Sequence, residues 1–139
     1  MFVLPNMTWL SPLGFAQQMI SASFQPNLVH VIDGSWNSTL DILAVRSDDN
    51  ATIVFRVVNM DDAAAPSTIQ VLGIQCAGRS SVQVSELYSD DGNLTAVNPP
   101  SEPTKISPRV GDSVEILNGT LHYTFKPSSF TTMTVKCDS

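Results

Sequence analysis

The sequence predicts a mainly β protein, a two-sheet antiparallel β-sandwich of jelly-roll-like type preceded by one short strand and an amphipathic helix. Three observations predict it. After Pro26, apolar and polar side chains alternate with the period of two that is typical of strands. Clusters of Asp, Asn, Ser and Gly separate these runs, as turn residues do. About eight such runs fit into roughly 110 residues, a density typical of sandwiches.

The first 26 residues follow a different pattern. The apolar run Phe2–Leu4 predicts a short buried strand, which an irregular loop follows. Ser11 and Pro12 suit the N-cap and the first turn of a helix. We expect about three helical turns, ending before Pro26. The apolar residues of this helix recur at three- and four-residue steps: Ala16, Met19, Ile20 and Phe24.

Two strands are expected on either side of the turn cluster at residues 47–50. The first is almost wholly apolar from Leu40 to Val45, as in the centre of a sandwich. The second, Ala51 to Asn59, alternates cleanly. One face should carry Ile53, Phe55 and Val57, and the other should carry Thr52, Val54, Arg56 and Val58. Together the two runs predict a hairpin.

Further strands are expected at residues 27–33, 69–74, 81–88 and 130–136. Between residues 98 and 108 four prolines interrupt any regular ladder, so this stretch predicts an ordered surface loop or a sheet edge. The pair Asn118-Gly119 lies between two apolar runs and satisfies the positive φ angles of a type I′ turn. A hairpin is therefore predicted there.

Composition limits the partners. A chain of 139 residues fits one compact domain, and its net charge of -6 repels phosphate backbones and anionic lipid headgroups. Nucleic acid and membranes are therefore not expected partners. No charged residue occurs before Asp33. Polar residues and prolines interrupt this stretch, so it fits a signal peptide poorly, and the same interruptions exclude a transmembrane helix.

Asparagine usage indicates a secreted glycoprotein. Five of the eight asparagines begin an N-x-[ST] sequon, whereas chance predicts roughly 1.6. The alternative is that Asn, Ser and Thr are simply common in β-turns. The expected N-glycosylation sites are Asn6, Asn37, Asn50, Asn93 and Asn118. An extracellular location follows from them.

The two cysteines, Cys76 and Cys137, are expected to form one disulfide, because paired cysteines are common in secreted chains. Closing a loop of about 60 residues would stabilise the fold by roughly 4 kcal/mol. Two unrelated buried thiols remain the alternative.

No catalytic or metal-binding constellation stands out. His30 and His122 have no neighbouring ligand at zinc spacing, and the sequence lacks a G-x-S-x-G elbow. The three Asp-Asp pairs all lie in expected turns. We therefore predict no catalytic residue, metal or cofactor. Trp9 and Trp36 could stack on sugar rings, although core packing is the commoner fate of Trp.

Several short motifs together resemble one family. They are Thr8-Trp9 before Pro12, the helix segment 16–20, Phe24-Gln25-Pro26, Val57-Val58-Asn59 and the run from Tyr123 to Thr131. In order and spacing they resemble the C-terminal region of secreted α-L-arabinofuranosidases of the family 51 glycoside hydrolase type. The resemblance covers nearly the whole chain.

This resemblance implies a catalytic (β/α)₈ barrel followed by a β-sandwich that packs on it. Residues 1–26 would then be a remnant of a barrel β/α unit, and residues 27–139 the C-terminal sandwich. The family cleaves arabinofuranosyl groups with two barrel glutamates, and none can be carried over to this chain, because Glu86, Glu102 and Glu115 lie in the sandwich. Trp9 would follow the last barrel strand, where active sites are built, and is the candidate sugar contact.

The expected function is thus a non-catalytic domain that stabilises the barrel of an enzyme acting on arabinose-containing polysaccharides of the plant type. The chain alone should be inactive. The alternative is a secreted glycan-binding or adhesion module without hydrolase activity. A third hypothesis is a structural glycoprotein that docks a partner through its apolar helix.

Overall fold

The computed structural model describes residues 1–32, 38–73 and 79–137, and it confirms the mainly β class. An N-terminal hairpin and one helix precede the strands of the main sheet. The elements are β1 (Phe2–Leu4), β2 (Met7–Trp9), α1 (Pro12–Ala22), β3 (Asn27–Val29), β4 (Leu40–Arg46), β5 (Thr52–Asn59), β6 (Ala65–Gln70), β7 (Arg79–Leu87), β8 (Arg109–Val110), β9 (Val114–Leu117), β10 (Thr120–Phe125) and β11 (Ser129–Lys136).

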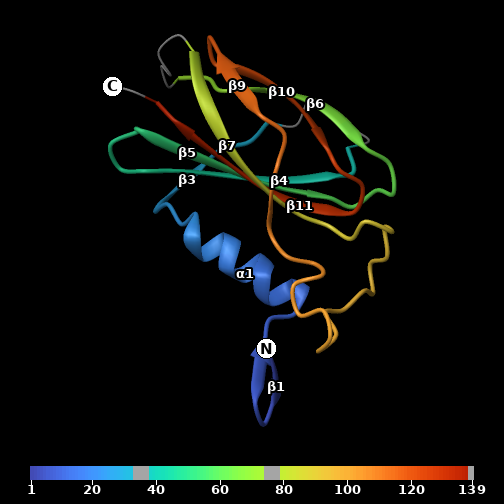
Figure 1. Cartoon of the computed structure of the whole chain (residues 1–139). Coiled ribbons are helices and arrows are strands. Elements are labelled where there is room, and N and C mark those ends of the chain that lie inside the picture. Colours follow the sequence, from blue (N-terminus) through green and yellow to red (C-terminus); the bar gives the residue numbers. More distant parts are fainter. Residues whose placement is uncertain (33–37, 74–78, 138–139) are drawn as a thin grey trace.

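The main sheet is antiparallel and curled. Its strand order within the described residues is β3-β4-β5-β11-β7-β9-β10-β6, with β8 added beside β7. Figure 1 shows β6, β9 and β10 as a layer over β4, β5 and β11. The two layers of the sandwich are halves of one hydrogen-bonded sheet, because β9 pairs with β7 on one side and with β10 on the other.

The core lies between these two layers. Ile53, Phe55 and Val57 share one face of β5, as expected, and that face borders the core. Phe125 and Leu121 from β10 meet them with no exposed surface. Burying a large apolar side chain contributes about 1.5–3 kcal/mol, so this layer contact is the main source of stability.

The predicted hairpin at Asn118-Gly119 is confirmed. Asn118 has φ 49° and Gly119 has φ 76°, the left-handed values that a type I′ turn requires. A Cβ at Gly119 would also lie 3.0 Å from the carbonyl oxygen of Val71. The turn joins β9 to β10 within one layer of the sandwich, and the pairing of β9 with β7 connects that layer to the other half of the sheet.

Helix α1 packs on the outer face of the sheet. Its start is as predicted: Ser11 is the N-cap, its hydroxyl accepts a 3.1 Å hydrogen bond from Gly14 N, and Pro12 opens the first turn. Met19 is buried against Leu87 and Ile106 in a second apolar cluster. This helix is not long and apolar enough to span a membrane, and no other occurs in residues 1–32, 38–73 and 79–137.

Three of the expected strands differ from the structure, and the one expected at residues 27–33 ends at Val29. Phe2–Leu4 does form a strand, but all three side chains are exposed, because its sheet partner is β2 alone and the hairpin projects beyond the helix (Figure 1). The expected irregular loop after it contains β2 instead. The strand expected at 69–74 begins earlier, at Ala65, and includes Pro66, which is tolerated because β6 is an edge strand.

Candidate functional site

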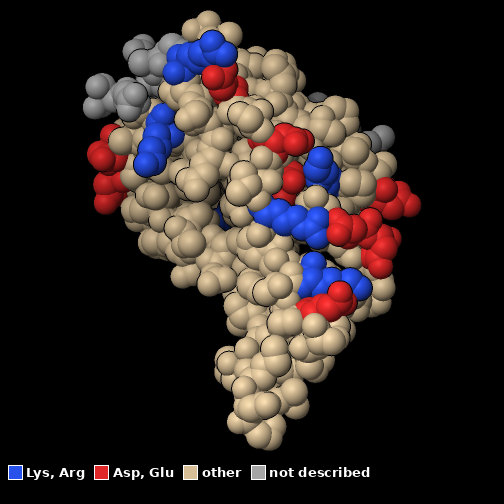
Figure 2. All heavy atoms as spheres, in the orientation of Figure 1, with Lys and Arg blue, Asp and Glu red and all other residues tan. Residues whose placement is uncertain are grey.

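The most distinctive surface of the molecule is the N-terminal hairpin with the outer side of α1. It bears no charged side chain, since residues 1–32 contain no Lys, Arg, Asp or Glu. Figure 2 shows the projecting hairpin without charged atoms, whereas acidic and basic side chains are distributed over the body above it. We call it the apolar N-terminal surface. Its large exposed side chains are Met1, Phe2, Val3, Leu4, Leu13, Ile20 and Phe24.

The helix carries more apolar residues than the sheet covers. Met19 faces the sheet with Phe15 and Ala16 beside it. Ile20 and Phe24, which the periodicity placed on the same buried face, are instead 41% and 68% exposed. They turn away from the sheet. An apolar face of this kind on a folded domain is typical of an interaction site.

Trp9 lies at the base of the projecting hairpin. Its ring packs against Phe2 with the ring centroids 5.3 Å apart. Its indole Nε1 donates a 2.8 Å hydrogen bond to the carbonyl oxygen of Asn98. Because the indole N–H is already paired, a sugar could use only the ring surface of Trp9. The predicted sugar contact stays a prediction.

Asn98 fixes the hairpin to the body of the protein. It is 2% exposed, and its Nδ2 donates to the carbonyl oxygens of Leu10 at 3.1 Å and Ile106 at 2.9 Å. Its Oδ1 accepts from Ile106 N at 2.8 Å. Sequence reasoning missed this residue, because nothing local distinguishes an asparagine beside prolines from an ordinary loop asparagine.

Arg56 fixes the other end of α1. From the outer face of β5, its Nη2 donates to the carbonyl oxygens of Ile20 at 3.2 Å and Ser23 at 3.0 Å. A cation there also favours the negative end of the helix dipole. Hydrogen bonds to the body of the protein therefore hold both ends of the helix and the base of the hairpin.

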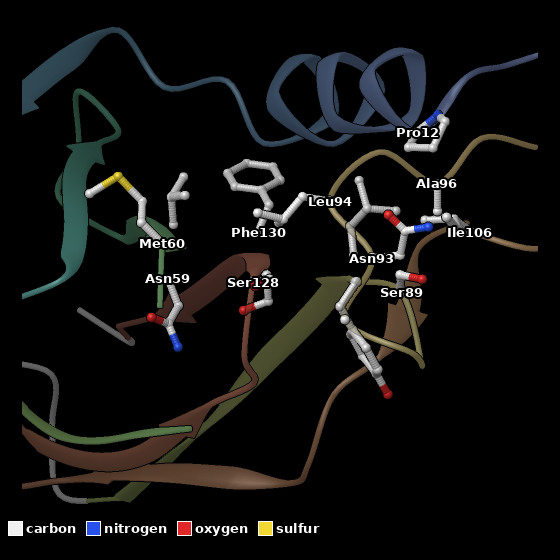
Figure 3. A pocket seen from close by; sticks show the side chains of 15 residues that line it. Pro12, Asn59, Met60, Ser89, Asn93, Leu94, Ala96, Ile106, Ser128 and Phe130 are labelled. Atoms are coloured by element: carbon white, nitrogen blue, oxygen red, sulfur yellow. The ribbon is translucent and has the colours of Figure 1, made fainter. Parts of the chain in front are cut away.

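A groove of about 340 Å³ opens beside the first turn of α1 (Figure 3). Its lining is mainly apolar and includes Pro12, Met60, Leu94, Ala96, Ile106 and Phe130. Ser89, Asn93 and Ser128 add polar atoms to the lining. It lies between the sheet and the loop that follows β7, on the same side of the sheet as the helix.

The three glutamates lie in different environments. Glu86 is 2% exposed and accepts a 2.6 Å hydrogen bond from Tyr123 Oη inside the sandwich. Burial, together with this contact, raises the pKa of Tyr123 above its usual range. Glu115 is ion-paired with Arg79 at the surface, and Glu102 is exposed in the proline-rich loop. They do not form a carboxylate pair on a shared cleft.

Gly111 explains why Tyr123 fits beside Glu86. A Cβ at this position would lie 2.5 Å from Val84 Cγ1 and 2.6 Å from Tyr123 Oη. The absence of a side chain therefore leaves room for the phenol. We interpret the pair as part of the interior packing.

The remaining expected polar sites are in turns or at the surface. His122 lies on β10, and its Nδ1 is 2.9 Å from Thr68 Oγ1. His30 is exposed just after β3. Of the acidic pairs, Asp90 bonds Arg109, whose guanidinium lies 4.7 Å from the ring centroid of Tyr88. This hydrogen bond lowers the pKa of Asp90.

The expected glycosylation sites that the structure describes, Asn6, Asn50, Asn93 and Asn118, are all exposed in turns or loops. Asn37, like Trp36, lies outside the described residues. Asn6 is in the turn between β1 and β2, on the apolar N-terminal surface. A glycan there would compete with a partner for that surface. Occupancy of all five stays a prediction.

The expected disulfide involves Cys137, which is buried just after β11. Its expected partner, Cys76, lies outside the described residues. The pairing stays a prediction.

Comparison with known proteins identifies the class of fold. A scan of protein-family models and a search of curated proteins both find no match. Among solved structures, the chain is similar to an arabinofuranosidase at 21% identity with a TM-score of 0.81, covering 97% of this chain and 31% of that one. The chain thus has the fold of a β module found in such glycoside hydrolases.

Two Thermotoga enzymes show the same relationship. An α-L-arabinofuranosidase from Thermotoga maritima, in complex with arabinose, matches with a TM-score of 0.77 and 22% identity over 92% of this chain and 29% of that one. The thermostable family 51 enzyme from Thermotoga petrophila matches with a TM-score of 0.78 and 21% identity over 96% of this chain and 31% of that one. The chain therefore spans less than a third of the length of each.

Proposed function

We propose that this chain is the non-catalytic C-terminal module of an α-L-arabinofuranosidase-like glycoside hydrolase, which packs on a catalytic barrel and stabilises it. The apolar N-terminal surface carries the proposal. Seven large apolar side chains, from Met1 to Phe24, are exposed there without a charge among them. Such a surface is costly in water unless another protein body covers it.

The hydrogen bonds that anchor this surface to the body support the same conclusion. Asn98 holds the hairpin, and Arg56 holds the end of α1. A surface that is ordered before binding loses less conformational entropy on association. Residues 1–26 then act as the remnant of a barrel β/α unit, and residues 27–139 as the sandwich that supports it.

The division of chemical roles follows. The acid/base and nucleophilic glutamates of a retaining glycosidase would be supplied by the barrel. Trp9, at the base of the hairpin, would line the sugar cleft and contact an arabinose-containing polysaccharide. The predicted glycans and the extracellular location belong to the same proposal.

Turnover of a chromogenic α-L-arabinofuranoside tests it. The chain is assayed alone and joined to the polypeptide encoded upstream of it. We expect no turnover by the chain alone and turnover by the joined protein. Turnover by the purified chain alone would contradict the proposal, as would an upstream region that encodes no barrel. In the latter case, binding on a glycan array would favour the adhesion-module alternative.

A double variant tests the contact itself. Leu13→Ser with Ile20→Ser makes the outer side of α1 polar without touching the buried Met19. We expect it to lower the thermal stability of the joined protein more than that of the chain alone. Leu72→Ser is the matched control, since Leu72 is 79% exposed near β6, away from the helix. Equal effects of both changes on the joined protein would contradict packing through α1.

A further inference from the structure

The groove beside α1 has a sequon asparagine in its lining. Asn93 lies on the loop after β7, next to Leu94, while Met60 and Phe130 come from the sheet side of the groove (Figure 3). A ligand that binds in an apolar groove is itself partly apolar. Asn93 brings a candidate occupant to the groove by a covalent bond.

The local geometry leaves the reactive atom of Asn93 available. Its Oδ1 accepts hydrogen bonds from both Thr95 N and Thr95 Oγ1, each at 2.9 Å. The backbone N of Asn93 donates to Asp91 Oδ1 at 3.0 Å, which keeps the loop ordered. Nδ2, the atom that carries the sugar in a glycosylated sequon, makes no hydrogen bond within residues 1–32, 38–73 and 79–137.

We propose that Asn93 is glycosylated and that the first N-acetylglucosamine of its glycan occupies this groove. In the attachment step, C1 of the sugar bonds to Asn93 Nδ2, which loses a proton. The bond from C1 to the diphosphate of a polyprenyl-linked oligosaccharide donor breaks, and the diphosphate leaves with the electron pair.

The chemistry of the sugar matches the groove. The C–H face of the ring and the acetyl methyl group are apolar and suit Leu94, Met60 and Phe130. The hydroxyl groups can bond to water or to the polar atoms of Ser89 and Ser128. A volume of about 340 Å³ is in the lower range of small-ligand sites and admits a sugar unit. The covalent link also gives the sugar a high effective concentration at the groove.

Two of the other described turn sequons provide a contrast. Asn50 and Asn118 lie in tight turns with φ 60° and 49°, and neither lines this groove. A glycan at Asn118 should extend into solvent. Asn93→Asp and Asn118→Asp are therefore matched variants, each removing one attachment point while keeping a side chain of the same size and turn preference.

The experiment uses the whole chain secreted from a glycosylating eukaryotic host. Peptide mass spectrometry gives occupancy at Asn93, and an endoglycosidase trims each glycan to one N-acetylglucosamine. We expect nuclear Overhauser contacts between the acetyl methyl of that sugar and the methyl groups of Leu94 and Met60. We also expect Asn93→Asp to lower Tm by about 2–4 °C, and Asn118→Asp to leave it nearly unchanged.

Several outcomes would overturn the proposal: an unoccupied Asn93, an occupied one without sugar contacts to the groove, or equal Tm changes in the two variants. Thr95→Ser keeps the sequon and should keep the Tm, whereas Thr95→Ala should reproduce Asn93→Asp. None of these measurements uses an arabinofuranoside, so a negative result for the glycan can be distinguished from a failure of the proposed function.

Discussion

The indole Nε1 of Trp9 donates a 2.8 Å hydrogen bond to the carbonyl oxygen of Asn98, although 89 residues separate them. The same asparagine binds Leu10 and Ile106 through its side-chain amide. One buried side chain thus connects the N-terminal hairpin, the start of the helix and the proline-rich loop. The orientation of the apolar N-terminal surface depends on this connection.

Replacing Asn98 should weaken the connection between the N-terminal hairpin and the body of the protein. Asn98→Ala removes three side-chain hydrogen bonds and leaves buried backbone groups unpaired, so we expect the free energy of unfolding to fall by about 2–3 kcal/mol. Urea denaturation followed by fluorescence measures this free energy of unfolding. Asn27→Ala is the control, because Asn27 makes an exposed hydrogen bond to Asp48 and should cost at most about 0.5 kcal/mol. Comparable losses in both variants would contradict the role of Asn98.

Arg56 should determine how firmly the end of the helix is held. Arg56→Met keeps an apolar stem but loses both hydrogen bonds to Ile20 and Ser23, and we expect a loss of about 1–2 kcal/mol. Amide hydrogen exchange should accelerate in the last turn of α1 and remain unchanged in β11. Arg56→Lys should restore part of the protection. Uniform acceleration across the sheet would point to global destabilisation instead.

Tyr123 should make stability fall at alkaline pH. Its folded-state pKa is raised above its usual value of about 10, mainly by burial and then by the hydrogen bond to Glu86. A raised pKa means that its stabilising contribution is present below pH 10 and is lost as pH rises through the folded value. The free energy of unfolding, measured from pH 8 to 11, should fall less steeply with pH in Tyr123→Phe than in the wild type. Equal slopes would contradict this assignment.

The predicted disulfide can be tested directly. If Cys76 and Cys137 are joined, the intact mass without reductant should be lower by two hydrogen atoms. Reduction should cost about 4 kcal/mol of stability, because it reopens a loop of about 60 residues. Cys76→Ser, Cys137→Ser and the double variant should then be equally destabilised. Unequal losses of stability in the two single variants would indicate two independent thiols.

Local patterns in the sequence were sufficient for the parts of the fold that depend on neighbouring residues. The alternation in β5 predicted Ile53 and Arg56 on opposite faces, and the structure confirms this, with Ile53 in the core and Arg56 on the side of α1. Ser11 and Asn118 were identified by cap and turn chemistry that involves only a few residues. These features need no knowledge of distant partners.

Features that depend on distant segments were missed or wrong. Burial of β1 was expected because its residues are apolar, yet Val3 is 63% exposed, since apolar character does not say which body covers a strand. The strand expected at 69–74 lies instead at Ala65–Gln70 and includes Pro66, which only a position at the sheet edge makes acceptable. The role of Asn98 required the fold, because its partners lie 88 and 8 residues away.

The position of β11 has a consequence for biosynthesis. This strand pairs with β5 on one side and β7 on the other, so it lies inside the sheet, although every other strand that the structure describes precedes it in the chain. A growing polypeptide therefore cannot complete the sheet until residues 129–136 have left the ribosome. Until then β5 and β7 each have an unpaired edge that can associate with other chains. Chaperones that hold nascent polypeptides should consequently have more influence on the yield of this protein than on that of a domain whose central strand is translated early.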